Sequence, residues 1–217
     1  MLNTVKIPAK SGNPKGSIVM LHGWGANAQD VAFLCALVDL PDVQFLLPDA
    51  PFPHPYSTVG KMWYDLSNAN FQTDFTQQSD LQTSRKALTD WLNSLEQETG
   101  IPLDRTILGG FSQGGAMTLD VGLSLPLAGL MILSGYQHGA LHPAAKNPPI
   151  LMVHGRQDQV VPLAAAHRAK ANLEQVKASI DYREFDMGHE ISPSVLNEIY
   201  TFVQKTLHLS PSNPKTT

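Results

Sequence analysis

A serine flanked by glycines constrains the fold of this chain more than any other feature of its sequence. Residues 110–114 read Gly-Phe-Ser-Gln-Gly and fit the pattern G-x-S-x-G, in which a strand turns sharply into a helix and exposes the serine hydroxyl. An apolar, β-branched run at 106–109 precedes the motif and a helix-forming run at 116–121 follows it. A passive serine in a glycine-rich turn would show the same pattern, so the interpretation depends on finding partners for Ser112.

Strand-like runs alternate with helical patterns along the chain. Several of these runs are apolar throughout, which is typical of strands covered on both faces of a parallel sheet. The predicted strands are Ser17–Leu21, Val43–Leu47, Thr106–Gly109, Gly129–Leu133, Ile150–His154 and Ile180–Phe185, and the main predicted helices are Ser79–Glu98, Leu163–Val176 and one that begins at Ser192-Pro193 with Ser192 as N-cap. The alternation predicts an α/β fold with a mostly parallel sheet and helices on both faces.

Composition limits the class of protein. The 217 residues are 42% hydrophobic and 16% charged, which suits one globular domain that we expect to span residues 1–209, followed by a polar, frayed tail at 210–217. A net charge of −4 without a basic stripe argues against a nucleic-acid partner, and no apolar run is long enough to span a membrane. The first 15 residues lack the apolar segment of a signal peptide, and the single cysteine, Cys35, excludes an internal disulfide. We therefore expect a cytoplasmic protein in which Cys35 is a small core residue.

A reactive serine needs a base that takes its proton and an acid that orients the base. In proteins with this sharp strand-to-helix turn, the nucleophile elbow, the acid and then the histidine follow the serine along the chain. His189 is the best-placed base, because it lies in a loop between the predicted strand ending at Phe185 and the last helix, and Gly188 permits the turn. His154, at the end of a predicted strand, is an alternative, whereas His167 lies within a helix and is expected at the surface.

Asp158 is the favoured acid between the serine and the histidine. It lies in the loop after the predicted strand Ile150–His154, at the sheet edge where α/β sites are built. Asp120 would lie two turns into the helix after the serine and point away from the site, and Asp186 is close in sequence to the histidine. A turn-forming aspartate without catalytic function would suit the same loop.

Metal binding is the other chemistry that the histidines could serve. His138 and His142 have the spacing of a helical metal pair, but Gly139 and Pro143 oppose a helix there and a third ligand is missing. The sequence that starts at His189-Glu190 begins like the zinc pattern H-E-x-x-H but lacks the second histidine. We expect no metal site.

Attack on a carbonyl group makes its oxygen negative, and two backbone N–H groups must already point at that oxygen. One N–H belongs to Gln113, the residue after the nucleophile, at the positive end of its helix. The second is expected from Trp24, because glycines at 23 and 25 let its backbone approach a substrate closely. His22 precedes these glycines and is predicted to be a structural hydrogen-bonding residue.

Together these motifs resemble the carboxylesterase, phospholipase and acyl-protein thioesterase family of small α/β-hydrolases. The matching stretches are Leu21–Gly25, Pro48–Pro51, Met62–Asp65, Gly110–Gly115, His154–Asp158 with Val161-Pro162, and Gly188-His189, in the family's order over nearly the whole chain. The resemblance implies a single-domain α/β-hydrolase fold without a cap domain and a triad of Ser112, Asp158 and His189. It also implies an oxyanion hole formed by Trp24 and Gln113, and hydrolysis of esters or thioesters with short or medium acyl chains without a cofactor.

Two stretches depart from the family's pattern where an acyl chain would lie. Position 24 is tryptophan where many relatives have an aliphatic residue, and the segment before Met62 is short. We expect Trp24, Met62 and Trp63 to contact the acyl group, although Met62 and Trp63 would serve equally well as packing residues.

The sequence therefore predicts a serine carboxylesterase that acts on a small-molecule ester or thioester. Acyl-protein thioesterase or lysophospholipase activity is the alternative within enzymes, and a binding module that keeps the scaffold is the alternative outside them. A homodimer is possible, and the aromatic side chains that could cover its interface are Phe33, Trp91 and Tyr200.

Overall fold

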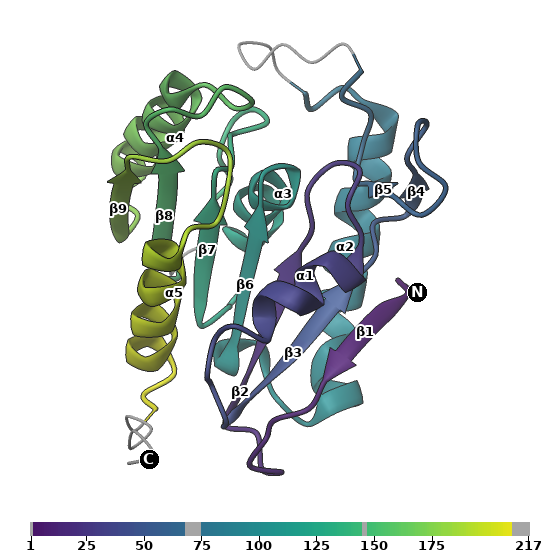
Figure 1. The fold of residues 1–217 in the computed structure, drawn as a ribbon, viewed down its shortest axis with the longest axis vertical. Coiled ribbons are helices and arrows are strands. Elements are labelled where there is room, and N and C mark those ends of the chain that lie inside the picture. Colours follow the sequence, from purple (N-terminus) through teal and green to yellow (C-terminus); the bar gives the residue numbers. More distant parts are fainter. Residues whose placement is uncertain (1, 68–74, 145–146, 210–217) are drawn as a thin grey trace.

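A seven-stranded sheet forms the centre of the protein in the computed structural model, which describes residues 2–67, 75–144 and 147–209 (Figure 1). The strand order is β1-β3-β2-β6-β7-β8-β9. All neighbouring strands in this sheet pair in parallel except β1, which is antiparallel to β3. The strands are β1 (Thr4–Ile7), β2 (Gly16–Leu21), β3 (Val43–Pro48), β6 (Thr106–Phe111), β7 (Gly129–Leu133), β8 (Ile150–Gly155) and β9 (Ile180–Phe185). The predicted α/β architecture with a mostly parallel sheet is confirmed.

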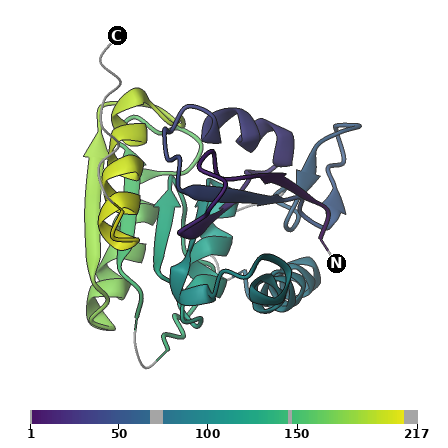
Figure 2. The same cartoon turned by 90° about the horizontal axis from the view of Figure 1, so that it is seen from below.

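Helices cover both faces of the sheet, as Figure 2 shows. Helices α1 (Ala28–Cys35) and α5 (Pro193–Thr206) pack on one face, and α2 (Ser79–Thr99), α3 (Gln113–Gly122) and α4 (Leu163–Gln175) on the other. The central strands β2, β6, β7 and β8 are buried almost throughout, since each contributes side chains to both hydrophobic layers. This two-sided burial explains why these strands read as continuous apolar runs.

The structure adds elements that the sequence pattern does not reveal. β1 was not predicted, and neither was a hairpin of two-residue strands, β4 (Phe52–Pro53) and β5 (Lys61–Met62). Most predicted elements differ from the observed ones by only one or two residues at an end. Ser192 occupies the N-cap position of α5, but its side chain makes no capping hydrogen bond, contrary to the prediction.

The register of the parallel strands brings four loops to one edge of the sheet. Leu21 is opposite Gly110, Phe111 is opposite Leu133, and Leu133 is opposite Val153. The residues that follow β2, β6, β7 and β8 therefore meet above the sheet in the view of Figure 1. This edge is where binding sites of α/β sheets form.

Several surface and core predictions can be compared with the structure. Cys35 is buried in α1, as predicted. Trp91 is 4% exposed and belongs to the core, so it cannot form a dimer face, whereas Phe33 is 72% exposed. The predicted tail at 210–217 lies outside the described residues. None of the helices in the described ranges combines the length and apolar character that crossing a bilayer requires.

Candidate active site

Ser112 occupies a strained turn between β6 and α3. Its φ of 56° and ψ of −117° lie outside the conformations that a non-glycine residue normally adopts. A Cβ on Gly110 would overlap the backbone of Gly114, and a Cβ on Gly114 would overlap the carbonyl of Leu21. The Ser112 N–H donates to the Leu133 carbonyl at 2.8 Å, which ties the turn to β7. The glycines of the motif are therefore required by backbone packing on both sides of the serine.

Three side chains from separate loops form one hydrogen-bonded chain. His189 Nε2 lies 2.9 Å from Ser112 Oγ, and His189 Nδ1 lies 2.7 Å from Asp158 Oδ2. The other carboxylate oxygen, Asp158 Oδ1, accepts the N–H groups of Val160 at 2.9 Å and Val161 at 2.8 Å. An ionised carboxylate only accepts, so Nδ1 carries the hydrogen and Nε2 is left to accept from the serine hydroxyl. This is the arrangement that a serine nucleophile needs.

Backbone contacts set the distance between the acid loop and the base loop. Arg156 N–H donates to Phe185 O at 2.8 Å, and Gln157 N–H donates to Met187 O at 3.1 Å. A Cβ on Gly155 would overlap the carbonyl of Met187, so the two loops approach more closely than any other residue would allow. The loop with Asp158 and the loop with His189 are thus held together independently of the hydrogen bond between those side chains.

The loop after β2 lies directly beside Ser112. A Cβ on Gly23 would come within 3.4 Å of Ser112 Cβ. Two later N–H groups of this loop already donate hydrogen bonds within the protein: Gly25 N–H donates to Lys61 O at 2.9 Å, and Ala26 N–H donates to Gly23 O at 3.3 Å. Gln113 begins α3, so its N–H is among those that a helix leaves without an intrahelical partner. Gly23 and the first residue of α3, Gln113, therefore lie next to the serine.

The side chain of Gln113 has a separate structural function. It is fully buried, accepts the Trp63 N–H through Oε1 at 3.0 Å and donates from Nε2 to Tyr64 O at 2.7 Å. Trp63 in turn donates its indole N–H to His22 O at 3.1 Å. Trp63 has no exposed surface, so the structure places it in the core and not in an acyl pocket as expected. Met62, in β5, is half-buried.

His22 is a structural residue, as predicted. Its Nε2 accepts the Ala50 N–H at 3.0 Å, so Nδ1 carries the hydrogen and donates to Gly23 O at 2.8 Å. Burial lowers the pKa of His22, which keeps the ring neutral. The neutral ring connects the loop after β2 with the loop after β3.

The hairpin β4–β5 supports the loop that carries Trp24. Lys61 N–H donates to Ala26 O at 2.8 Å, which adds a second backbone hydrogen bond to the one from Gly25. The rings of Trp24 and His54 meet edge to face with their centroids 4.2 Å apart. The sequence analysis did not single out His54. This residue lies between β4 and β5, and two-residue strands are too short to give a periodic signal.

The remaining candidates of the sequence lie elsewhere. Asp120 receives two hydrogen bonds from Arg85, at 2.8 and 3.0 Å, and lies 3.4 Å from His138 Nδ1. Although burial opposes its ionisation, hydrogen bonding to His138 and Arg85 holds the pKa of Asp120 below its usual value. His138 Nε2 contacts the Tyr64 hydroxyl at 2.7 Å. His167 is exposed on α4, as predicted, and the described part of the chain contains no cluster of three or more potential metal ligands.

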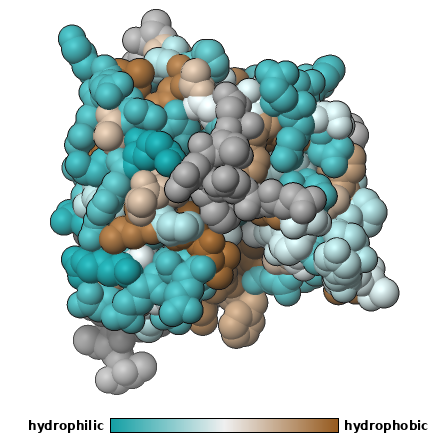
Figure 3. Space-filling model, turned by 90° about the horizontal axis from the view of Figure 1, so that it is seen from above, coloured by the Kyte–Doolittle hydropathy of each residue, from teal (hydrophilic) through white to brown (hydrophobic). Residues whose placement is uncertain are grey.

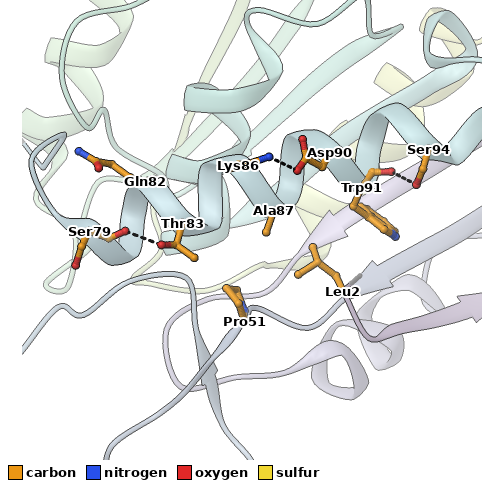
Figure 4. Close-up of a pocket in the computed structure, with 10 residues that line it drawn as sticks. All are labelled: Leu2, Pro51, Ser79, Gln82, Thr83, Lys86, Ala87, Asp90, Trp91 and Ser94. Atoms are coloured by element: carbon orange, nitrogen blue, oxygen red, sulfur yellow. Dashed lines mark hydrogen bonds and ion pairs between the residues drawn. The ribbon is translucent and has the colours of Figure 1, made fainter.

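The surface carries hydrophobic areas and a pocket that lies away from Ser112. Seen from above, the molecule shows one hydrophobic area below the middle of the face and smaller ones toward its upper edge, among side chains that are mostly hydrophilic (Figure 3). A separate pocket of about 860 Å³ lies between α2 and the segments at Leu2 and Pro51 (Figure 4). Neither Ser112 nor its partners line that pocket, and Lys86 and Asp90 form an ion pair beside it at 2.7 Å. The pocket is therefore separate from the candidate active site.

Comparisons with known proteins identify the family to which the chain belongs. Residues 2–207 match the model of the phospholipase/carboxylesterase family. Acyl-protein thioesterase 1 of Saccharomyces cerevisiae is 28% identical over 95% of this chain and 99% of its own. Acyl-protein thioesterase 1 homolog 1 of Dictyostelium discoideum is 32% identical over 76% of this chain and 77% of its own. The crystal structure of esterase PE8 is 29% identical, with a TM-score of 0.85 over 94% of this chain and 99% of that one. These matches confirm the resemblance seen in the motifs and the α/β-hydrolase fold.

Proposed function

Because the chain belongs to the phospholipase/carboxylesterase family of serine hydrolases, we propose that it hydrolyses carboxylic esters with short or medium acyl chains through an acyl-enzyme intermediate. The observation that carries this proposal is the hydrogen-bonded chain of Ser112, His189 and Asp158, with distances of 2.9 and 2.7 Å. A serine hydroxyl at neutral pH is a poor nucleophile without such a base.

In the acylation step, Ser112 Oγ attacks the carbonyl carbon of the ester while His189 Nε2 takes the hydroxyl proton. The Asp158 carboxylate stabilises the imidazolium that forms and keeps the ring in the tautomer that accepts at Nε2. The carbonyl oxygen becomes negative and accepts hydrogen bonds from the backbone N–H groups of Trp24 and Gln113. Such donors are each worth about 10²- to 10³-fold in rate.

Collapse of the tetrahedral intermediate breaks the bond to the alcohol or thiol, which leaves with the proton that His189 returns. The acyl group is then an ester of Ser112 Oγ. A water molecule gives its proton to His189 Nε2 and attacks this ester, and the carboxylic acid is released with the serine restored. Every proton moves through His189, and this cycle uses no cofactor.

Trp24 and Met62 are the side chains that we place beside the acyl group. Trp24 is half-buried, and as a backbone oxyanion donor it would bring its own side chain near the acyl group. A large aromatic side chain at this position restricts the space for a long acyl chain. This is the reason for assigning short and medium esters, and Trp63 is not included because it is buried.

A second candidate function is the hydrolysis of acyl thioesters, favoured by the relatives that are acyl-protein thioesterases. The same residues would perform it, since only the leaving atom changes from oxygen to sulfur. Oxygen esters and thioesters with matched acyl chains, assayed side by side, separate the two. A higher kcat/KM for thioesters at every chain length would favour this second function, whereas hydrolysis of a lysophospholipid would favour lysophospholipase activity.

Ser112→Ala tests the proposal directly. The variant should lose turnover of p-nitrophenyl butyrate while its thermal unfolding stays close to that of the wild type. An alkyl fluorophosphonate should add once per chain to the wild-type protein, on Ser112, and not at all to the variant. Persistent turnover in the variant would refute the assignment of the nucleophile. A wild-type protein that hydrolyses no ester or thioester and takes up no phosphonate would instead indicate a binding module.

A further inference from the structure

A second histidine lies next to the triad acid and takes no part in the steps described above. His154 is the last but one residue of β8 and has no exposed surface. Its Nε2 lies 2.9 Å from the Val161 carbonyl oxygen and 3.5 Å from Asp158 Oδ2. The sequence suggested His154 as an alternative base, but the hydrogen bond to Ser112 is made by His189.

The contacts of His154 determine where its hydrogen lies. A carbonyl oxygen only accepts, so Nε2 must carry the hydrogen and donate it to Val161. Burial lowers the pKa of His154, and its Nδ1 is buried without a hydrogen-bond partner among the described residues. The ring is therefore neutral. Its Nε2–H donates to the Val161 carbonyl and lies next to the carboxylate of Asp158.

Val161 connects the ring of His154 to the carboxylate of Asp158, because its backbone contacts both. Its carbonyl accepts from His154, and its N–H donates to Asp158 Oδ1 at 2.8 Å. Oδ1 is thus held by the loop backbone, while Oδ2 is left to accept from His189 Nδ1 at 2.7 Å. If the ring N–H were lost, the Val161 carbonyl would be left buried and unpaired, and the loop that orients the carboxylate would have to shift.

We infer that His154 is a positioning residue for the triad acid: its Nε2–H holds the Val161 backbone and faces Asp158 Oδ2, which orients the carboxylate toward His189. The inference rests on the proposed function and deepens it, because it assigns a task to a side chain that touches neither the substrate nor the serine. His154 acts through Asp158 alone.

Two consequences for the reaction follow from this position of His154. Misalignment of the acid reduces the rate of the chemical steps more than the binding of substrate, so kcat falls while KM changes little. The N–H dipole beside Oδ2 also draws negative charge away from the bond to His189. Without that dipole the carboxylate favours the protonated base more strongly, so the acid limb of the pH–rate profile moves to higher pH.

Two amide variants isolate the N–H group. In His154→Gln the amide nitrogen can take the place of Nε2 and donate to Val161, whereas in His154→Asn the side chain is one methylene shorter and its amide cannot reach. Both variants bury a neutral amide, so they carry similar penalties for burial. His138→Asn is the matched control, because His138 is also buried but contacts Tyr64 and Asp120 and not the triad.

The assay is p-nitrophenyl butyrate hydrolysis from mildly acidic to mildly alkaline pH. Rates are divided by the concentration of sites that react with the fluorophosphonate, so that unfolded protein is excluded from the enzyme concentration. For His154→Asn we expect kcat to fall about 10- to 100-fold, with KM within about twofold and the acid limb at higher pH. His154→Gln should stay within about threefold of the wild type with the acid limb unmoved, as expected if one N–H carries the effect. His138→Asn should unfold at a lower temperature with the acid limb unmoved.

Equal rates and equal acid limbs for the Asn and Gln variants would overturn the inference, even if both are impaired. So would a wild-type kcat per reactive site in His154→Asn. The Ser112→Ala variant, assayed in parallel, tests the proposed function separately: turnover in that variant refutes the nucleophile regardless of how the His154 variants behave.

Discussion

Gln113 holds the backbone of Tyr64 through a hydrogen bond of 2.7 Å, so the residue that follows Ser112 is fixed by its side chain as well as by its helix. The side chain makes a second bond to Trp63 N–H, and all of these groups are buried. The backbone N–H of Gln113 is thereby positioned beside Ser112 by a contact with a loop about 50 residues earlier in the chain, since the two hydrogen bonds span 50 and 49 residues.

Replacing this amide should therefore cost stability. We expect Gln113→Leu to lower the free energy of unfolding by about 2–4 kcal/mol, because the Trp63 N–H and Tyr64 C=O are left buried and unpaired. Urea denaturation measures the loss. Gln44→Leu, which removes a partly buried bond to Ser17 Oγ, serves as the comparison and should cost about 1 kcal/mol. A Gln113 variant as stable as the wild type would contradict the structural function of the amide.

The acid should be essential for the rate and dispensable for the fold. We expect Asp158→Asn to lower kcat about 10³- to 10⁴-fold, since the amide no longer stabilises the imidazolium and favours the wrong tautomer of His189. The amide oxygen can still accept from Val160 and Val161, so thermal unfolding should change little. Asp186→Asn is the control, because its carboxylate is 76% exposed and pairs with Arg156. Steady-state kinetics with p-nitrophenyl butyrate decide the matter, and comparable activity in the two variants would exclude Asp158 as the acid.

The glycines of the elbow should tolerate no side chain. We expect Gly114→Ala to destabilise the protein by about 3 kcal/mol or more, because the methyl group would overlap the carbonyl oxygens of Leu21 and His22, which cannot move without displacing β2. Gly188→Ala is the counterpart, since a methyl group on Gly188 would meet no atom within 4 Å among the described residues. Calorimetric melting temperatures should fall for the first variant and stay near the wild-type value for the second. Equal melting temperatures would mean that the elbow is less closely packed than described.

Trp24 should set the length of the acyl chain that is accepted. In Trp24→Leu the backbone donor remains while the indole is removed, so the ratio of kcat/KM for octanoate to that for acetate should rise about tenfold or more. A series of p-nitrophenyl esters measures the ratio. Tyr56→Leu removes an aromatic ring that is 79% exposed and should leave the ratio unchanged. A fall of kcat/KM by the same factor for all esters would show that the indole supports the loop instead of selecting the substrate.

Two buried histidines should make the protein less stable in acid. Burial lowers the pKa of both His22 and His154 in the folded state, below the value of about 6.5 that a histidine has in the unfolded chain. Above that pH neither state binds the proton and the two groups contribute nothing. As the pH falls below about 6.5, the unfolded chain takes up protons that the folded protein refuses, so the free energy of unfolding declines until the lowered folded pKa values are reached.

Thermal unfolding measured as a function of pH checks this expectation. His22→Gln should be less stable overall, because its two hydrogen bonds are altered, but its stability should decline less steeply between neutral and mildly acidic pH. His142→Gln, at an exposed position, should keep the wild-type slope. An unchanged slope in His22→Gln would show that His22 does not contribute to the acid sensitivity.

Much of the fold could be predicted from the sequence because its signals are local. The six predicted strands are present, since buried parallel strands are apolar along their whole length. The strand–turn–helix setting of Ser112 follows from glycine spacing, which reflects steric limits within a few residues. The strands β1, β4 and β5 were missed because two to four residues give no measurable period, and they exist only through pairing with distant partners.

By itself, the sequence determined the α/β class and predicted a candidate nucleophile, Ser112, with a short list of partners in the expected chain order. Tertiary structure alone decided which histidine reaches Ser112, because His154 lies at the end of β8 and His189 follows β9, and only the register and the loop contacts separate their positions. It also decided that Trp63 is buried and that Asp120 pairs with Arg85, two facts that depend on residues 35 or more positions apart. Glycine spacing and hydrophobic runs express the preferences of a single segment, whereas the partner of a buried polar group is chosen by whichever distant segment packs against it.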